Sequence, residues 1–366
     1  MNPQLFSFAA RLRELIHQHK FFCGDQPLHS QFDALALELF ALQFKSNSTY
    51  QKICAARQLT PENVRHWKQI PAVPTSAFKE LELTSLAPAE RTTVFYSSGT
   101  TEQTPSRHFH YAESLAVYEA SLWTWFQIHF GDSGQFLFLT PTAQAAPHSS
   151  LVHMFETVRQ KLLLPETAFT GIISADGSWA LDFTATIGRL QSTCDSGTPL
   201  TLLGTAFSFV HLLDHLAENN LLFQLPKGSR VMETGGYKNR SRVLPKAELH
   251  ALIRKFLGIK TIRCEYGMSE LSSQAYDSAV RAETGKPGIT RCFELPPWAS
   301  AQIISPETGQ EVADGETGLI RIFDLANVFT VAAIQTEDLG IRRDEHFELL
   351  GRAQFAEPRG CSLMTS

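Results

Sequence analysis

The sequence predicts an α/β fold, in which mainly parallel sheets are flanked by helices and a small β-barrel-like piece follows near the C-terminus. Three observations predict it. Short apolar runs bounded by turn residues recur from Thr92 onward, separated by stretches with apolar residues spaced three and four apart. Between residues 299 and 348 the pattern changes to short alternating runs divided by turn sequences. The 366 residues are 43% hydrophobic and 19% charged, which provides enough apolar material for a large core.

Helical patterns dominate the first ninety residues. Residues 1–20 mix apolar and charged side chains at helical spacing, which predicts an amphipathic helix rather than a secretion signal. A second helix is predicted over residues 32–44, and a proline-marked segment, IPAVPTSAFK, covers residues 70–79. No stretch approaches the ~20 consecutive apolar residues of a membrane-spanning helix. We therefore expect a cytoplasmic protein without a membrane span.

Strands and helices alternate through the middle of the chain, which favours parallel strand pairing. The predicted strands are TTVFY from Thr92, QFLFLT from Gln135, PLTLLGT from Pro199, SRVMETGG from Ser229 and TIRCEYG from Thr261. The predicted helices cover residues 112–130, 150–163, 207–219 and 246–257. We expect residues 1–350 to form one core domain, in which 299–350 is the small β subdomain, and residues 351–366 to form a truncated C-terminal lid or tail.

Charge and cysteine content exclude several classes of protein. The formal net charge of -5 supplies no basic field for a nucleic-acid backbone or an anionic membrane, so neither is an expected partner. The six cysteines contain no CxxC pair, so their spacing indicates neither a zinc site nor a disulfide framework. Cys361 differs from the others because it lies in a polar, glycine-containing tail, and it needs a separate explanation.

A candidate phosphate-binding loop, YSSGTTEQTPSRH, begins at Tyr96. Directly after a predicted strand, residues 97–101 place two serines, a glycine and two threonines in one turn. Glycine allows close backbone approach, and the hydroxyls and amides can cradle phosphate oxygens. The Gly-Lys-Ser/Thr ending of a Walker loop is absent. Such a turn is more often an ordinary surface loop, so its interpretation depends on the other motifs.

METGGYK also follows a predicted strand. Its paired Gly235 and Gly236 would let the chain pass flat beside a planar base, with Tyr237 and Lys238 near at hand. The alternative is a tight turn without a ligand.

EYGMSE, after the next predicted strand, sets an aromatic ring, a glycine, a hydroxyl and a carboxylate close together. Tyr266 could stack on a base, Ser269 could bond a phosphate, and Glu270 could hold magnesium, which prefers hard carboxylate oxygen. In isolation an ordinary turn would again be the better interpretation.

Two short pieces complete the series. QTEDLG places Asp338 where a carboxylate could accept bonds from both ribose hydroxyls, and Gly351 with Arg352 follows. Each piece is weak alone, but five in this order and spacing are difficult to attribute to chance. The ordered set therefore predicts a nucleotide site.

The series SSGTT, GGY, YGMSE, TEDLG and GR resembles the adenylate-forming superfamily of acyl-CoA ligases, aryl-CoA ligases and firefly-type luciferases, over roughly residues 96–360. The resemblance implies the large N-terminal domain of that superfamily, with ATP and Mg²⁺ as cofactors. It implies that Tyr266 stacks on adenine, Ser269 touches the α-phosphate and Glu270 binds Mg²⁺, while Asp338 and Arg352 hold the ribose. The nucleotide-binding set by this resemblance is Ser97, Ser98, Gly99, Thr100, Thr101, Gly235, Gly236, Tyr237, Tyr266, Gly267, Ser269, Glu270, Asp338 and Arg352.

A closer resemblance is to the LuxE-type acyl-protein synthetases, and it is carried by IPAVPTSAFK, SSLVHM, METGGYK and EPRGCSL. Those enzymes, also called long-chain-fatty-acid protein ligases, form acyl-AMP and load the acyl group onto their own cysteine near the C-terminus. They then hand the thioester to a partner fatty-acyl reductase. The matching cysteine here is Cys361, and the implied substrate is a fatty acid or a related carboxylic acid.

Two departures from the superfamily pattern affect the expected chemistry. The sequence ends shortly after the GR motif, where CoA ligases continue into a lid domain with a catalytic lysine. The phosphate loop has Glu102 where the superfamily usually has Gly, and Ser106-Arg107 near where it usually has Pro-Lys. A flexible tail ending in a cysteine could itself supply the nucleophile, and Arg359 would favour the thiolate of Cys361. The missing lysine requires another cation, for which the candidates are Arg107, Lys238, Arg240 and Arg359.

Two other functions remain open at this stage. A stand-alone acyl- or aryl-CoA ligase would use free CoA, and labelling of the protein itself without CoA would exclude that as the main activity. A catalytically weak adenylate-fold subunit that scaffolds a reductase complex would bind ATP without pyrophosphate exchange.

Four histidines cluster in the sequence without the HExxH spacing of a metal site. They are His108, His110, His148 and His153. We expect structural or cleft-lining roles for them, with His153 a candidate for the acyl pocket. The aromatic residues of the helix over 121–130 are expected in the core.

Overall fold

The N-terminal part of the molecule is helical. The computed structural model describes residues 2–18, 28–97, 104–237, 241–281 and 289–353. Asn2 caps the first helix by accepting the N–H of Gln4 at 3.0 Å, and Leu5, Phe8 and Leu12 then face the core. Both helices predicted for this region are confirmed. The helices are α1 (Pro3–His17), α2 (Leu28–Ser46), α3 (Ser48–Ala56) and α4 (Ala77–Glu80), with 3₁₀ turns at Trp67–Gln69 and Pro88–Glu90.

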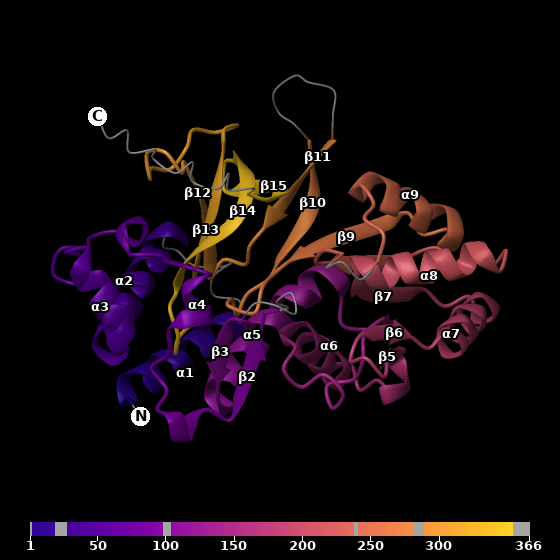
Figure 1. The fold of residues 1–366 in the computed structure, drawn as a ribbon, viewed down its shortest axis with the longest axis horizontal. Helices are drawn as coiled ribbons and strands as arrows, with labels where there is room; N and C mark the ends of the chain where they lie inside the picture. The colour runs from indigo at the N-terminus through magenta and orange to yellow at the C-terminus, as the bar shows by residue number, and fades with distance from the viewer. Residues whose placement is uncertain (1, 19–27, 98–103, 238–240, 282–288, 354–366) are drawn as a thin grey trace, which may run out of the picture.

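One mixed sheet of eleven strands runs through the molecule (Figure 1). Its order is β12 (Ala299–Ile304), β13 (Thr317–Asp324), β14 (Ala333–Arg343), β15 (His346–Arg352), β11 (Ile289–Glu294), β10 (Ala275–Arg281), β9 (Thr261–Tyr266), β8 (Arg230–Thr234), β7 (Leu200–Thr205) and β4 (Gln135–Phe138), with β1 (Val73–Pro74) beside β14. The strands β4, β7, β8 and β9 are parallel, as are β1 and β14, and all the other neighbours are antiparallel. The α/β prediction is confirmed.

The antiparallel part of the sheet begins earlier than the sequence pattern indicated. It includes β10 and β11, which lie before residue 299 and join the predicted small β piece through β15. The turn from β9 to β10 is short, whereas a parallel return needs a crossover of a dozen or more residues, usually a helix. The small β piece and the parallel strands thus share one continuous sheet.

The predicted strand at Thr92 lies outside this sheet. It forms β2 (Thr93–Tyr96), which pairs with β3 (Arg107–His110) as an antiparallel hairpin. A second two-stranded sheet consists of β5 (Gly171–Ile173) and β6 (Trp179–Leu181). The first hairpin carries the candidate phosphate loop at its tip.

Helices cover the parallel strands. Two of them, α5 (Ala112–Phe130) and α9 (Lys246–Leu257), match the predicted ranges, and α6 (Ser150–Lys161) and α8 (Ala206–Glu218) match within two residues. The others are α7 (Phe183–Ser196) and a 3₁₀ turn at Glu166–Ala168. Side chains from β7, β8, α8 and α9 form a separate apolar cluster. The elements α8, α9 and β7 are at the right of Figure 1.

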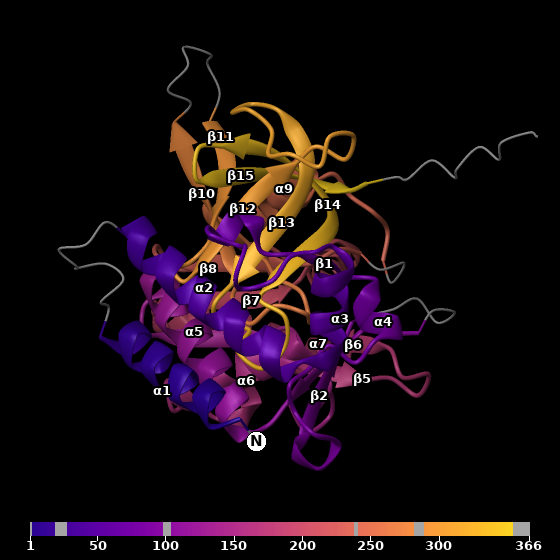
Figure 2. The same ribbon diagram turned by 90° about the vertical axis from the view of Figure 1, so that its left-hand side faces the viewer.

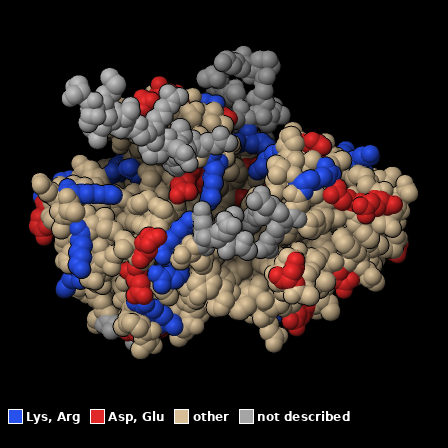
Figure 3. All heavy atoms as spheres, viewed as in Figure 1, with Lys and Arg blue, Asp and Glu red and all other residues tan. Residues whose placement is uncertain are grey.

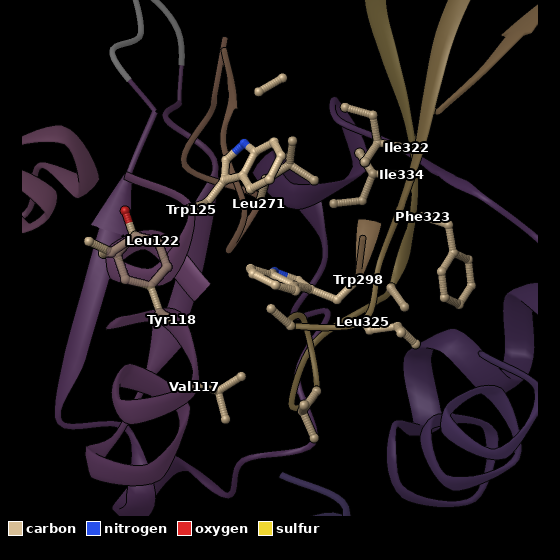
Figure 4. Packing of buried hydrophobic residues seen from close by; sticks show 14 of the residues in the cluster. Val117, Tyr118, Leu122, Trp125, Leu271, Trp298, Ile322, Phe323, Leu325 and Ile334 are labelled. Atoms are coloured by element: carbon tan, nitrogen blue, oxygen red, sulfur yellow. The ribbon is translucent and has the colours of Figure 1, made fainter. Parts of the chain in front are cut away.

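Trp298 lies at the centre of the main core, between α5 on one side and β13 and β14 on the other (Figure 4). Its Nε1–H donates to Ser121 Oγ at 2.8 Å, and Ser121 Oγ lies 2.9 Å from Ser273 Oγ. Ser273 in turn donates to Asp324 Oδ1 at 2.8 Å. This chain of buried bonds joins α5, the turn before β10 and the end of β13. Trp125 of α5 is also buried, as predicted for the aromatic part of that helix.

The view in Figure 2 shows α1 and α2 on the near side, with the strands of the large sheet behind them. None of the helices in the described ranges has both the length and the apolarity needed to cross a membrane.

Candidate active site

The hairpin loop and the turn after β9 meet through a cluster of buried oxygen atoms. Ser106, at the end of the loop, donates its hydroxyl to Glu270 Oε1 at 2.5 Å, and Ser269 donates to Glu270 Oε2 at 2.9 Å. At the other end of the loop, Ser97 accepts the N–H of Ser106 at 2.9 Å through its side chain. All three members of the contact, Ser106, Ser269 and Glu270, are buried. The tertiary structure therefore joins the first and third predicted motifs.

His108 fixes the same junction from the hairpin strand. Its Nδ1 lies 2.7 Å from the backbone oxygen of Ser269, so this ring nitrogen carries the proton and donates it. Burial lowers the pKa of His108 to about 4, although the bond to Ser269 acts in the opposite direction. At neutral pH the ring is uncharged and holds the Ser269 turn by one directed bond.

Tyr266 and Asp338 form a second contact within the predicted site. The Tyr266 hydroxyl donates to Asp338 Oδ2 at 2.8 Å, and the ring packs edge-on against Phe293 and Phe347. Burial raises the pKa of Asp338. The hydrogen bond from Tyr266 and the positive charge of Arg352 act in the opposite direction. Arg352 lies opposite Asp338 in the β14–β15 pair. Only 7% of Tyr266 is exposed, so its ring offers little free face in this conformation, and stacking on a base stays a prediction.

The METGG motif ends on the surface beside β9. Gly235 has φ +70°, which favours glycine, and both it and Gly236 are exposed. An added Cβ on either glycine would meet no atom within 4 Å, so a planar ligand has room to approach the backbone. Tyr237 is half-buried, and its hydroxyl donates to the backbone oxygen of Leu244 at 2.8 Å. It anchors the segment after the glycines.

Glu265 is a buried carboxylate in the EYGMSE motif to which the sequence analysis assigned no role. It accepts a hydrogen bond from Thr234 Oγ1, which ties the end of β8 to the end of β9. Burial raises its pKa to about 7, although the Thr234 bond acts in the opposite direction. Gly267 follows within two residues, where an added Cβ would lie 2.3 Å from Glu265 Oε1. Its position next to Tyr266, at the end of a predicted strand, was the sequence feature that could have indicated a role for Glu265.

Ser106 was named only as a place where the loop departs from the superfamily pattern, yet it makes the contact that joins the two motifs. A serine at the end of a hairpin loop has no sequence feature that predicts a functional contact. Its role depends on the approach of Glu270, which is 164 residues away in the chain.

Arg107 is the candidate cation that the structure places. It lies on β3 opposite Tyr96, and its guanidinium carbon is 5.8 Å from the centre of the Phe109 ring. Its Nε is buried without a hydrogen-bond partner, and within the described ranges no carboxylate forms an ion pair with it. Arg107 therefore has donor capacity available, on the face of the hairpin that also carries Phe109. The other predicted residues Ser98, Gly99, Thr100, Thr101, Lys238, Arg240, Arg359 and Cys361 lie outside the described residues.

The remaining histidines have structural contacts. His153 Nε2 lies 3.1 Å from Glu119 Oε1, and His148 Nδ1 lies 3.0 Å from the backbone oxygen of Val94. Both line a hollow of about 410 Å³ along the β2–β3 hairpin, together with Val94 and Phe109. A role for His153 in an acyl pocket stays a prediction.

The donor atoms around Glu270 fit a magnesium ion. A carboxylate and two serine hydroxyls are hard oxygen donors, which Mg²⁺ prefers to nitrogen or sulfur. Each carboxylate oxygen of Glu270 already accepts one hydroxyl bond, which fixes its orientation. On the face shown in Figure 3, acidic and basic side chains of the described residues are interspersed, without one extended basic field.

The fold is that of the adenylate-forming ligases. The chain is similar to a solved structure of 2-hydroxyisobutyryl-CoA ligase in complex with 2-HIB-AMP, with a TM-score of 0.62 and 13% identity over 88% of this chain and 67% of that one. A second structure of that ligase, with 2-HIB-AMP and CoA in the thioesterification state, gives a TM-score of 0.61 at 14% identity. Against ATP-bound MatB from Rhodopseudomonas palustris, the match has a TM-score of 0.48 and spans about half of that chain (49%).

Residues 14–366 match the family described as acyl-protein synthetase, LuxE, and the chain belongs to this family. It is 27% identical over 357 residues to the long-chain-fatty-acid–luciferin-component ligase of Aliivibrio fischeri, covering 90% of this chain and 86% of the relative. Identity to the ligase of the same name from Vibrio harveyi is 24% over 340 residues, with 89% and 85% covered. Both the fold and the family expected from the motifs are confirmed.

Proposed function

We propose that this protein uses ATP and Mg²⁺ to convert a long-chain fatty acid to acyl-AMP, and then transfers the acyl group to its own Cys361. The observation that carries the proposal is the contact of Ser106 and Ser269 with the two oxygens of Glu270. It brings the candidate phosphate loop against the candidate metal carboxylate. The family match and the names of the two curated relatives support a fatty acid as the substrate.

The nucleotide would lie along the ends of β8 and β9. Gly235 and Gly236 leave the backbone open to a planar base, and Asp338, oriented by Tyr266, would accept hydrogen bonds from the ribose. Glu270 would hold Mg²⁺, which neutralises charge on the phosphates during attack at the α-phosphorus. Positioning and charge neutralisation provide most of the catalysis in phosphoryl-type transfers, so the chain needs oriented donors more than a strong base.

Arg107 is the cation we propose for the loop. Its buried Nε has no partner, which is costly for a charged group unless a ligand supplies an acceptor. Its side chain lies on the same face of the hairpin as Phe109, whereas its neighbours Ser106 and His108 contact the Ser269–Glu270 turn from the other face. The guanidinium would therefore approach a phosphate from the open face of the hairpin. Lys238, Arg240 and Arg359 remain candidates from the sequence for the same charge.

The acyl transfer would involve the tail that the sequence predicts over residues 351–366, of which Gly351 and Arg352 complete β15, acting on the core that precedes it. The Cys361 thiolate attacks the carbonyl carbon of the mixed anhydride, a C–S bond forms, and the C–O bond to phosphate breaks as AMP leaves with the electron pair. Arg359, two residues away, would favour the thiolate form. A fatty-acyl reductase is the proposed recipient of the thioester, and the cytoplasm is the proposed compartment because free thiols persist there.

The test uses the full chain with ATP, Mg²⁺ and a panel of radiolabelled fatty acids, without CoA. Hydroxylamine-labile label should appear on the wild type and disappear in Cys361→Ser, while ATP–pyrophosphate exchange continues in both. Cys194→Ser is the control variant, because Cys194 is a partly exposed free cysteine of α7, and it should retain the label.

Two results would contradict the proposal. Acyl-AMP formation with label only on added CoA would identify a CoA ligase. ATP binding without pyrophosphate exchange in the wild type would identify a scaffold subunit.

A further inference from the structure

Three chemically different side chains converge in the interior beside the candidate nucleotide site. They are Glu233 of β8, His250 of α9 and Cys264 of β9, which are 2%, 5% and 1% exposed. Their ligand atoms form a closed triangle, with Sγ to Oε2 3.3 Å, Nε2 to Oε2 3.4 Å and Sγ to Nε2 3.8 Å. No metal-binding spacing in the sequence indicates this cluster, because each residue comes from a different helix or strand.

The triangle has the dimensions of a tetrahedral zinc site. With bond lengths of about 2.3 Å to sulfur and about 2.0–2.1 Å to nitrogen and oxygen, tetrahedral geometry requires about 3.5–3.6 Å from sulfur to either oxygen or nitrogen, and about 3.3–3.4 Å between nitrogen and oxygen. The observed edges differ from these values by about 0.3 Å or less. A single ion could therefore contact all three atoms with little movement of Glu233, His250 or Cys264.

We propose that Glu233, His250 and Cys264 bind one zinc ion, with a water or another donor in the fourth position. Carboxylate, imidazole and thiolate are all zinc ligands, and a thiolate disfavours Mg²⁺ and Ca²⁺. The proposal is independent of the reaction at Cys361.

Charge balance accompanies binding. A Zn²⁺ ion is neutralised by the Glu233 carboxylate and the Cys264 thiolate, so the S–H bond breaks, a Zn–S bond forms and one proton passes to solvent. Without a metal, the thiol of Cys264 and the ring of His250 share Glu233 Oε2 as their acceptor. The Lys246 ammonium lies 3.7 Å from the same oxygen. Its side chain is 49% exposed, so it can turn toward water and leave a path for the ion.

The ion would hold together the strands that present the two central motifs. Glu233 precedes Thr234 at the end of β8, and Cys264 precedes Glu265 and the EYGMSE turn at the end of β9. We therefore expect the metal to stabilise the folded core, with its effect largest on unfolding.

The test measures metal directly on the full-length protein. After equilibration with zinc and removal of excess ion, the wild type should retain about one zinc per chain. Cobalt(II) in its place should give thiolate-to-cobalt charge-transfer absorption and d–d bands of tetrahedral intensity. In Cys264→Ser that charge-transfer absorption should be lost, and zinc affinity should fall at least about tenfold, since even changes around a metal ligand often cost that much. Cys292→Ser, which alters another buried free cysteine, should behave as the wild type.

The proposal is overturned if the wild type retains only trace zinc and cobalt shows no thiolate band. It is equally overturned if Cys264→Ser keeps stoichiometric metal, because the ion would then lie elsewhere. Even if Cys264→Ser fails to fold, the cobalt spectrum of the wild type still tests the proposal, since the absence of a thiolate band would overturn it. All of these readouts are separate from acyl transfer, so failure of one proposal is distinguishable from failure of the other.

Discussion

Ser106→Ala removes one hydroxyl from the contact that joins the hairpin loop to the EYGMSE turn. In the wild type that hydroxyl donates to Glu270 Oε1 at 2.5 Å, and both side chains are buried. The substitution leaves the backbone bonds between Ser97 and Ser106 in place. It therefore tests the orientation of Glu270 with little change to the hairpin itself.

The expected magnitude follows from the kind of bond that is lost. A hydrogen bond to a charged acceptor contributes roughly 1.5–3 kcal/mol, more than a bond between neutral groups, and burial of Glu270 places the loss near ~2 kcal/mol. The remaining bond from Ser269 limits the damage to one carboxylate oxygen. If the full amount appears in the transition state for adenylation, kcat/KM falls by about 30-fold, since ~1.4 kcal/mol is a factor of ten.

The assay is ATP–pyrophosphate exchange, measured beside urea unfolding at pH 8. Ser273→Ala is the matched control, because Ser273 is also a buried serine that donates to a buried carboxylate, Asp324, at 2.8 Å. Burial raises the pKa of Asp324 to about 6, so this acceptor is ionised at pH 8. Both variants should lose similar stability, but only Ser106→Ala should lose exchange activity beyond the unfolded fraction.

Equal kinetic losses in the two variants would refute the reasoning, because the effect would then reflect general destabilisation. Unchanged exchange in Ser106→Ala, together with the expected loss of stability, would show that the bond to Glu270 serves only the fold.

Three further changes test other parts of the structure. Tyr266→Phe removes the bond to Asp338 and should raise the KM for ATP by about five- to tenfold, a loss of ~1–1.4 kcal/mol, while thermal unfolding reports any structural effect. An unchanged KM would exclude Tyr266 as the residue that orients this carboxylate. Glu265→Gln removes a group whose folded pKa, about 7, exceeds its ordinary value of 4.5, so its stabilising contribution is complete below about pH 4.5 and is lost as the pH rises through 7. The variant should thus be more stable than the wild type at pH 8, by an amount on the order of 3 kcal/mol, and urea unfolding from pH 5 to pH 8 should show a flatter profile; parallel profiles would contradict the assignment. Trp298→Ala should cost roughly 3–5 kcal/mol in unfolding free energy through the cavity at the core centre, whereas Trp298→Phe should cost clearly less, and equal losses would point to the indole hydrogen bond as the main contribution.

Local patterns were sufficient for most of the helices and parallel strands. The helix over 112–130 has the same bounds in the structure, because apolar periodicity and the glycine that follows at Gly131 act within the segment itself. Strands β10 and β11 were not predicted, since their pattern includes charged residues such as Asp277 and Arg291. Those two side chains form an ion pair across the sheet, which makes them compatible with burial only after the strands have paired.

The order of the motifs was sufficient for the class of protein and the family. Five short segments in a fixed order gave the resemblance to the adenylate-forming ligases, and the family match over residues 14–366 confirms the family. The strands that carry two of these motifs, β8 and β9, were predicted and are confirmed, while the nucleotide-binding roles of the residues at their ends stay predictions.

Tertiary structure alone decided which atoms meet. The sequence by itself determined the alternation of elements, the motif order and the candidate residues, since these depend on local periodicity and composition. The contact of Ser106 with Glu270 depends on approach across 164 residues, and the triangle of Glu233, His250 and Cys264 depends on packing α9 beside two parallel strands. Such contacts cannot be predicted from the local sequence, because the distances between their atoms depend on how whole helices and strands are placed relative to one another.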